Sequence, residues 1–183
     1  MISDREAAIL GLMFEENLYG YEIEKTIEER NMRKWTEIGF SSIYYILKRL
    51  ERSELVESSE KQVEGRNRRI YSITNKGEES MKEKVRDLLT NNVKIISPFD
   101  LGIAYIHILK KRTATKCLDE YINSAEERMI RLAMSLQNPE YEETNYRKVA
   151  LLERPLELIK TEITWVKQFI ETIKKVKRFR KGD

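Results

Sequence analysis

The sequence has few of the residues that cross-link a chain or interrupt its helices and strands. Its 183 residues include one cysteine, seven glycines and three prolines. With Cys117 alone, no disulfide can form within the chain, which is typical of a protein in a reducing cytosol. Few glycines and prolines together with 36% charged residues favour a helix-rich protein over a β-sandwich or a disordered chain.

Long hydrophobic runs are also missing. The longest apolar-looking stretch, 101–109, is interrupted by Gly102 and His107 and is far shorter than the ~20 residues that a membrane-spanning helix needs. The first six residues carry three charged side chains, unlike a secretory signal peptide. We therefore expect a cytoplasmic protein with no membrane partner.

The sequence offers no catalytic constellation. His107 is the only histidine, and a zinc site needs about four nitrogen, sulfur or oxygen ligands. There is no glycine-rich phosphate loop and no nucleophile motif. We expect no enzyme activity, no metal and no cofactor. Because the net charge is only +3, nucleic-acid binding must rest on local clusters of positive charge.

Residues 1–92 contain the order helix, helix, helix, hairpin, helix. Ser3 and Glu6 have the capping-box spacing that begins a first helix, and Trp35 is expected to fill the core after the second. Residues 55–58 and 69–73 favour β-strands, with the polar stretch 61–68 between them as the hairpin tip. This order predicts a winged helix-turn-helix domain.

The third helix, expected over 43–52 after a serine cap, has two different faces. At 100° per residue, Ile43, Ile46, Leu47 and Leu50 share one face, and polar or cationic side chains lie opposite. An apolar back and a cationic, hydrogen-bonding front are what a recognition helix needs. An ordinary amphipathic helix with a solvated face is the alternative interpretation. The basic hairpin that follows this helix favours the interpretation as a DNA-recognition helix. The candidate DNA-binding residues are Ser41, Ser42, Tyr44, Tyr45, Lys48, Arg49, Arg52, Lys61, Arg66, Asn67, Arg68 and Arg69.

Residues 98–183 predict an all-helical, coiled-coil-like domain. In the last helix, apolar residues recur at alternating steps of three and four, a spacing that favours contact with partner helices, and Pro155 predicts a bend or break. We assign this stripe to dimerisation: Val149, Leu152, Leu156, Ile159, Ile163, Val166, Ile170 and Ile173. Trp165 beside it is a possible ligand-pocket residue, although packing at an interface is favoured. The basic stretch 174–181 is expected to be solvated, with a DNA or acidic-partner contact as the alternative.

Four blocks of sequence together resemble the PadR family of transcription regulators: ILGL at 9–12, YGYEI at 19–23, SIYYILKRLE at 42–51 and GRNRRIYSITNKG at 65–77. The resemblance implies a winged-helix repressor that dimerises through C-terminal helices and binds a roughly palindromic operator. It places the DNA contacts at 41–52 and 66–69. Ser53-Glu54 stands where the family often has a glutamate-glycine turn.

The sequence therefore predicts a mostly α (α+β) protein with a winged helix-turn-helix at 1–92 and a helical dimerisation domain at 98–183. We expect a sequence-specific regulator that binds double-stranded operator DNA as a homodimer. We expect it to act as a ligand-responsive repressor with a small molecule as its effector. The alternative is a helical interaction module that uses the winged helix and the coiled coil to bind a protein partner.

Overall fold

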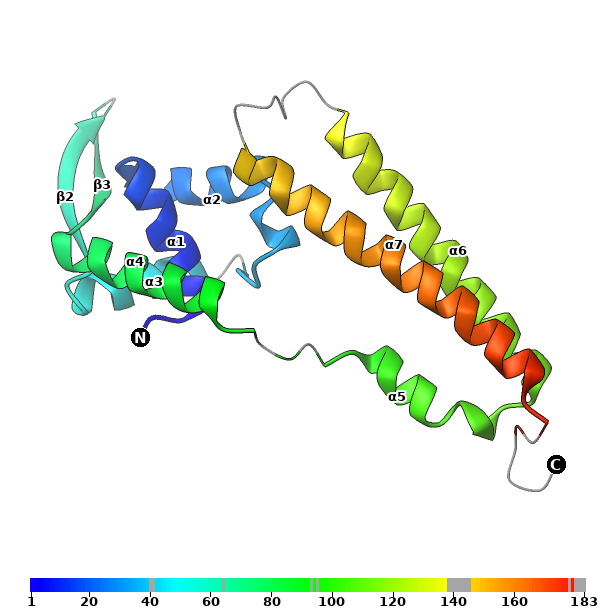
Figure 1. The fold of residues 1–183 in the computed structure, drawn as a ribbon. Helices are drawn as coiled ribbons and strands as arrows, with labels where there is room; N and C mark the ends of the chain where they lie inside the picture. The colour runs from blue at the N-terminus through cyan, green and yellow to red at the C-terminus, as the bar shows by residue number, and fades with distance from the viewer. Residues whose placement is uncertain are drawn as a thin grey trace. The chain divides into compact units, whose positions relative to one another are not determined.

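The computed structural model describes residues 1–39, 42–63, 65–92, 94, 96–137, 146–177 and 179. The chain divides into two compact units, Met1–Lys94 and Ile95–Asp183 (Figure 1). The sequence predicts the joint between residues 92 and 98. Each unit has its own hydrophobic core.

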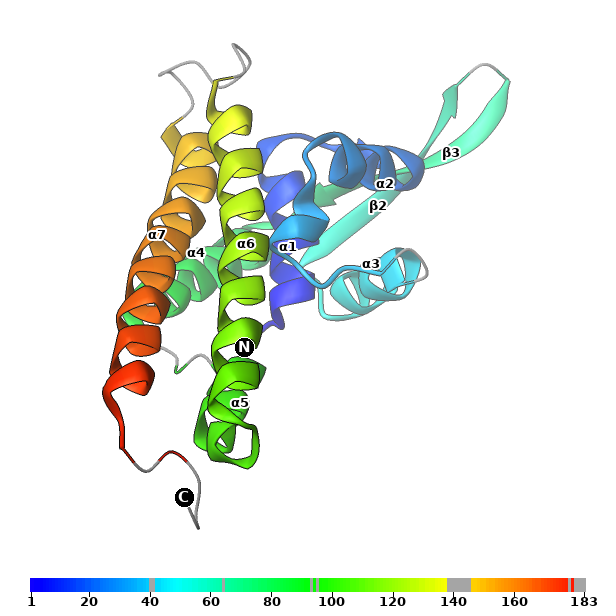
Figure 2. The same cartoon turned by 90° about the vertical axis from the view of Figure 1, so that its right-hand side faces the viewer.

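The N-terminal unit is a winged helix-turn-helix, as the sequence predicts. Its elements are α1 (Asp4–Glu15), β1 (Leu18–Tyr19), α2 (Gly20–Glu29), the 3-10 helix η1 (Met32–Lys34), α3 (Ile43–Arg52), β2 (Val56–Val63), β3 (Arg66–Ile73) and α4 (Asn75–Thr90). The three strands form an antiparallel sheet in the order β1-β3-β2. The β2–β3 hairpin, the wing, extends away from the helices of this unit (Figure 2).

The wing is longer than expected, and β1 was not expected at all. Pairing continues to Val63 opposite Arg66, so Lys61 lies within β2 and not at a hairpin tip. Gly65 in the turn has φ +75°, a conformation that favours glycine. Because β1 has two residues, its sequence carries no alternation from which a strand could be recognised.

The core of this unit lies under one face of each of the first three helices. Its largest fully buried side chains are Ile9, Leu10, Met13, Ile23, Ile27, Ile43, Leu47, Leu50 and Val56. Trp35 was expected there but is 49% exposed. Met32, in η1, and Ile38, after it, are buried in its place.

A tight turn joins α3 to the wing. The Leu55 amide donates to the Leu50 carbonyl at 2.9 Å and the Glu54 amide to the Glu51 carbonyl at 2.9 Å, which is a Schellman motif. Leu50 and Leu55 are both buried. Glu54 has φ +60°, so the turn keeps its geometry with a glutamate at a position that favours glycine.

The same turn also anchors α4. The Thr74 amide donates to the Leu55 carbonyl at 3.1 Å, and the Thr74 hydroxyl donates to the Glu54 carbonyl at 2.8 Å. A Cβ added at Gly77 would lie 2.0 Å from the Leu55 oxygen. Gly77 is therefore required for α4 to approach the turn this closely.

The C-terminal unit is built on two long antiparallel helices. Its elements are α5 (Pro98–Ala104), the 3-10 helix η3 (Ile106–Ile108), α6 (Lys111–Leu136) and α7 (Tyr146–Lys175). Helices α6 and α7 lie side by side (Figures 1 and 2). The Lys111 ammonium donates to the carbonyls of Lys174 at 2.7 Å and Val176 at 3.0 Å, so the first residue of α6 satisfies carbonyls at the end of α7. Within the described ranges, no helix combines the length and hydrophobicity of a membrane span.

The predicted stripe of α7 finds its helix partner inside the chain. Leu156, Ile159, Ile163, Val166, Ile170 and Ile173 are buried, and the last five form one core with Leu118 and Ile122 of α6. Val149 and Leu152 are half-buried. Contact between two copies through this stripe stays a prediction, and its buried members could not reach a second copy without separating α6 from α7. A bend or a break was expected at Pro155. Helix α7 continues through Pro155 without a break, and the bend stays a prediction.

We expect replacement of Glu54 by glycine to give a more stable protein than replacement by alanine. Both changes remove the exposed contact of Glu54 with Lys76 at 3.0 Å, so their difference isolates the backbone. The left-handed conformation costs a non-glycine residue ~1–2 kcal/mol, against ~0.5–1 kcal/mol of extra chain entropy for glycine. In urea unfolding, the free energy of unfolding of Glu54→Gly should be about 0.5–1 kcal/mol higher than that of Glu54→Ala. Equal stabilities would contradict a strained turn.

Candidate nucleic-acid interface

The outward face of α3 is open to solvent, as its periodicity predicts. Ile43, Ile46, Leu47 and Leu50 are buried, so the opposite side faces away from the core. Tyr44 and Tyr45 are 64% and 66% exposed, and Lys48 and Arg52 are exposed beside them. This surface presents aromatic hydroxyls and cations together.

At the start of α3, the Ser42 hydroxyl donates to the Gly39 carbonyl at 2.6 Å. Ser42 is the N-cap residue of α3, as the sequence predicts, but its side chain makes no capping bond to a helix amide. Ser41 lies outside the described residues.

Arg49 is bound to a buried carboxylate. Its Nε lies 2.9 Å from Oε1 of Glu6, and Glu6 is 5% exposed. The other oxygen of Glu6 accepts from the Ser3 amide at 2.8 Å and the Ser3 hydroxyl at 2.7 Å. Glu6 therefore caps α1 and ties α1 to α3. Arg49, a candidate for DNA contact, has a structural partner that the sequence did not reveal.

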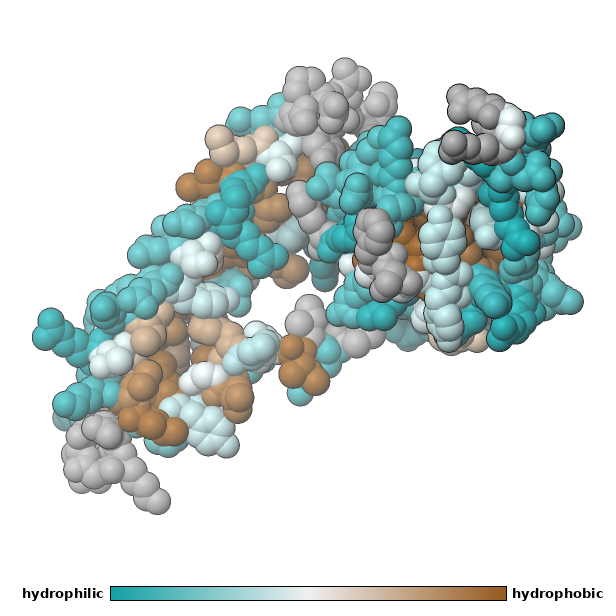
Figure 3. Space-filling model, turned by 180° about the vertical axis from the view of Figure 1, so that it is seen from behind, coloured by the Kyte–Doolittle hydropathy of each residue, from teal (hydrophilic) through white to brown (hydrophobic). Residues whose placement is uncertain are grey.

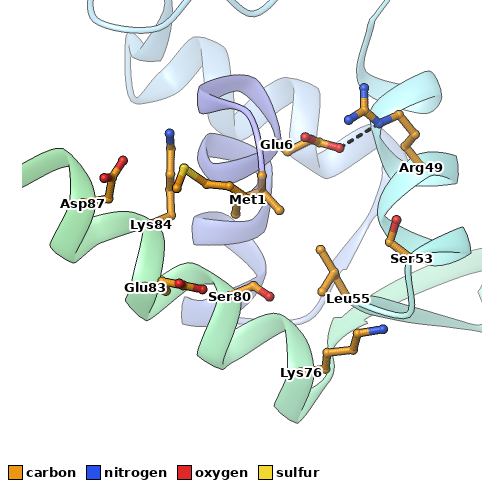
Figure 4. A pocket seen from close by; sticks show the side chains of 11 residues that line it. Met1, Glu6, Arg49, Ser53, Leu55, Lys76, Ser80, Glu83, Lys84 and Asp87 are labelled. Carbon is orange, nitrogen blue, oxygen red and sulfur yellow. Dashed lines mark ion pairs between the residues drawn. The ribbon is translucent and has the colours of Figure 1, made fainter. Parts of the chain in front are cut away.

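A polar hollow of about 450 Å³ lies beside this ion pair (Figure 4). Its charged side chains are of both signs: Glu6, Arg49, Lys76, Glu83, Lys84 and Asp87. Lys84, which is buried, pairs with Asp4 at 2.8 Å. The mixed charges give this hollow no uniform attraction for phosphate, so we assign no DNA contact to it.

The wing directs its cations to two sides. Glu60 and Arg69 are paired across β2 and β3, as are Lys61 and Arg68, and successive residues of a strand point to opposite faces. Arg69 lies 3.6 Å from Oε2 of Glu51 on α3. Arg68 lies over the ring of Tyr21, 4.9 Å from its centroid. Asn67 is exposed, and the side chain of Arg66 lies outside the description.

Three of the candidate cations keep their charge uncompensated. Among the residues that the structure describes, Lys48, Arg52 and Lys61 have no ion pair, whereas Arg49 and Arg69 each meet a glutamate. These three cations lie on the front of α3 and on one face of the wing. Such a surface can neutralise phosphates and donate hydrogen bonds.

The C-terminal unit contributes aromatic pairs. Phe99 stacks on Tyr121 at 4.2 Å and Trp165 on Phe169 at 5.1 Å. Burial and a hydrogen bond with Glu162 raise the pKa of Tyr121 to about 12, so its phenol is protonated at neutral pH. Trp165 is 44% exposed. In the described part of the chain, no cluster of His, Cys, Asp and Glu could hold a metal ion.

A helix-turn-helix whose third helix and wing both present cations defines a winged-helix protein of the DNA-binding class. Residues 9–83 match the transcriptional regulator PadR-like family. An uncharacterized protein of Lysinibacillus sphaericus is 32% identical over 83 residues, which cover 45% of this chain and 75% of that protein. The chain belongs to the PadR-like family of transcriptional regulators.

Solved structures agree in fold. The structure of Bacillus subtilis PadR in complex with operator DNA matches with a TM-score of 0.70 at 21% identity, covering 92% of this chain and 98% of that one. Bacillus subtilis PadR in complex with p-coumaric acid matches with a TM-score of 0.72 at 20% identity, covering 93% and 98%. The matched fold thus includes the helical C-terminal unit as well as the winged helix.

We expect Arg49→Ala and Arg52→Ala, on the same helix, to differ in stability. Loss of Arg49 leaves the buried Glu6 carboxylate without its ion-pair partner, which should lower the free energy of unfolding by about 1–3 kcal/mol. Arg52 is exposed and has no ion pair among the described residues, so its replacement should change stability by less than about 0.5 kcal/mol. Urea unfolding followed by circular dichroism measures both. A small effect at Arg49 would show that the Glu6 contact contributes little.

Proposed function

We propose that this protein is a sequence-specific regulator that binds double-stranded operator DNA as a homodimer and acts as a ligand-responsive repressor. The observation that carries the proposal is the outward face of α3, where Lys48 and Arg52 are uncompensated and lie with two exposed tyrosines. Its activity is binding and not catalysis, and we place it in the cytoplasm.

The two DNA-facing elements have different tasks in this proposal. Helix α3 enters the major groove, where Lys48, Arg52 and the tyrosine hydroxyls reach phosphates and base edges. The wing lies along the backbone, where Lys61 and Arg68 meet phosphates. Arg49 and Arg69 act mainly by holding α3 to α1 and the wing to α3.

We propose that a second stripe of α7 forms the dimer surface. Leu151, Leu158 and Trp165 are spaced by seven residues, so they share one side of the helix, and each is close to half exposed. Further exposed apolar side chains of this unit are Leu101, Tyr105 and Ile108 near α5 and Ile130 and Met134 on α6. Figure 3 shows hydrophobic residues gathered around α5 on the face in view. Exposed apolar side chains that gather on one face are typical of an interaction site.

A small-molecule effector completes the proposal. The Bacillus subtilis protein of similar fold was solved with p-coumaric acid, and we propose that an aromatic or amphipathic compound binds the C-terminal unit here, with Trp165 as the first candidate contact. An effector releases DNA only if it binds the DNA-free arrangement of the dimer more tightly than the DNA-bound one.

The proposal is tested by gel shift on DNA from upstream of the protein's own gene, across a salt series. Wild-type protein should bind in the presence of competitor DNA, with an affinity that falls steeply as salt rises because bound phosphates release counterions. Lys48→Glu should weaken binding by roughly tenfold or more and reduce the salt slope by about one.

The matched control is Lys116→Glu in the C-terminal unit, which makes the same change in net charge at an exposed lysine and should bind normally. Equal loss in both variants would mean that binding follows net charge and not the α3 face. A folded wild-type protein that binds no DNA even at low salt would favour the protein-interaction alternative.

The dimer surface is tested by the pair Leu158→Glu and Thr164→Glu. A carboxylate at position 158 should be costly to bury between two copies and should shift the protein to monomer in sedimentation equilibrium. Thr164 is exposed on another side of α7, so its variant should stay dimeric. A dimeric Leu158→Glu variant would place the interface elsewhere.

A further inference from the structure

The first turn of α2 touches both DNA-facing elements. Tyr19, the last residue of β1, pairs with Ile70 of the wing. The next two residues, Gly20 and Tyr21, begin α2. Gly20 faces α3, because a Cβ added there would lie 3.0 Å from the ring of Tyr44. Tyr21 faces the wing, because Arg68 lies over its ring.

The ring of Tyr21 is held in place from two directions. It stacks on Tyr19 with centroids 5.9 Å apart and an angle of 18° between the ring planes. Its hydroxyl donates to Oε1 of Glu22 at 3.2 Å. The second oxygen of Glu22 accepts from the Tyr19 amide at 2.9 Å. One carboxylate thus orders both tyrosines at the start of the helix.

We propose that Tyr21 is a positioning residue that sets the placement of the wing on DNA by holding the Arg68 guanidinium against its ring. This inference rests on the proposed DNA-binding function and adds a residue outside α3 and the wing. The distance of 4.9 Å from the Arg68 Cζ to the ring centroid is within the ~6 Å range of a cation–π contact.

A ring suits this task better than a carboxylate would. Attraction to the ring face restrains the guanidinium without placing a negative charge beside it, because the aromatic face carries no net charge. Glu51, by contrast, offsets the positive charge of Arg69, with which it pairs. Tyr21 thereby links the spacing between α3 and the wing to a helix that carries none of the candidate DNA-binding residues.

The test is a double-mutant cycle in DNA affinity with Tyr21→Leu, Arg68→Gln and both changes together. The probe is the duplex from upstream of the protein's own gene, followed by fluorescence anisotropy. Tyr21→Leu should weaken binding by about two- to fivefold, as expected for loss of an exposed cation–π contact. In the Arg68→Gln background the same change should have little further effect. Tyr21→Phe, which keeps the ring, should restore affinity to within about twofold of wild type.

A DNA-independent measurement separates this inference from the function on which it rests. Amide hydrogen exchange in the free protein should be faster around Arg68 in Tyr21→Leu than in Tyr21→Phe, because the wing loses its restraint. Amide exchange around Arg68 that is the same in Tyr21→Leu and Tyr21→Phe would overturn the proposal. So would a loss of DNA affinity on Tyr21→Leu that is equally large in the Arg68→Gln background. If wild-type protein binds no duplex, the proposed function fails, and the exchange data still decide whether Tyr21 restrains the wing.

Discussion

Four aliphatic side chains of α3 are buried in the core of the N-terminal unit, and their burial determines which side of this helix faces solvent. The helix cannot rotate about its axis without exposing them, at a cost of about 1.5–3 kcal/mol for each side chain. The C-terminal end of α3 is also anchored, because the turn at Glu54 and Leu55 leads into the wing and contacts the start of α4. The side of α3 that carries its cations and the point where the wing begins follow from these two constraints.

Charge pairing then divides the cations of this surface. The chain carries a net charge of only +3, so its ability to attract DNA depends on where glutamates lie as well as on where lysines and arginines lie. Glu6 and Glu51 meet Arg49 and Arg69 and thereby connect α3 to its neighbours. The remaining positive charge is directed outward, which favours an oriented encounter with DNA over general stickiness.

Local periodicity was sufficient to predict α3 and its outer face, because a helix with one apolar face has one way to pack on a core. It could not reveal the pairing of Arg49 with Glu6, since residues 43 positions apart carry no sequence signal of their contact. The stripe of α7 illustrates the same limit. A spacing of three and four residues predicts a helix partner, but it does not distinguish α6 of the same chain from a second copy. Trp35 was misplaced because aromatic character alone does not indicate burial.

The packing of the apolar stripe of α7 on α6 also limits where an effector can bind. Because the buried side of α7 is occupied by α6, a compound at Trp165 would meet the outer side of α7, which is the proposed dimer surface. Binding of the effector and association of two copies would then be linked, and linkage is reciprocal: whatever the compound does to dimer affinity, dimerisation does to the affinity for the compound. Since two recognition helices bind a palindromic operator only when they are held together, the compound could control DNA binding through the dimer without contacting either α3 or the wing.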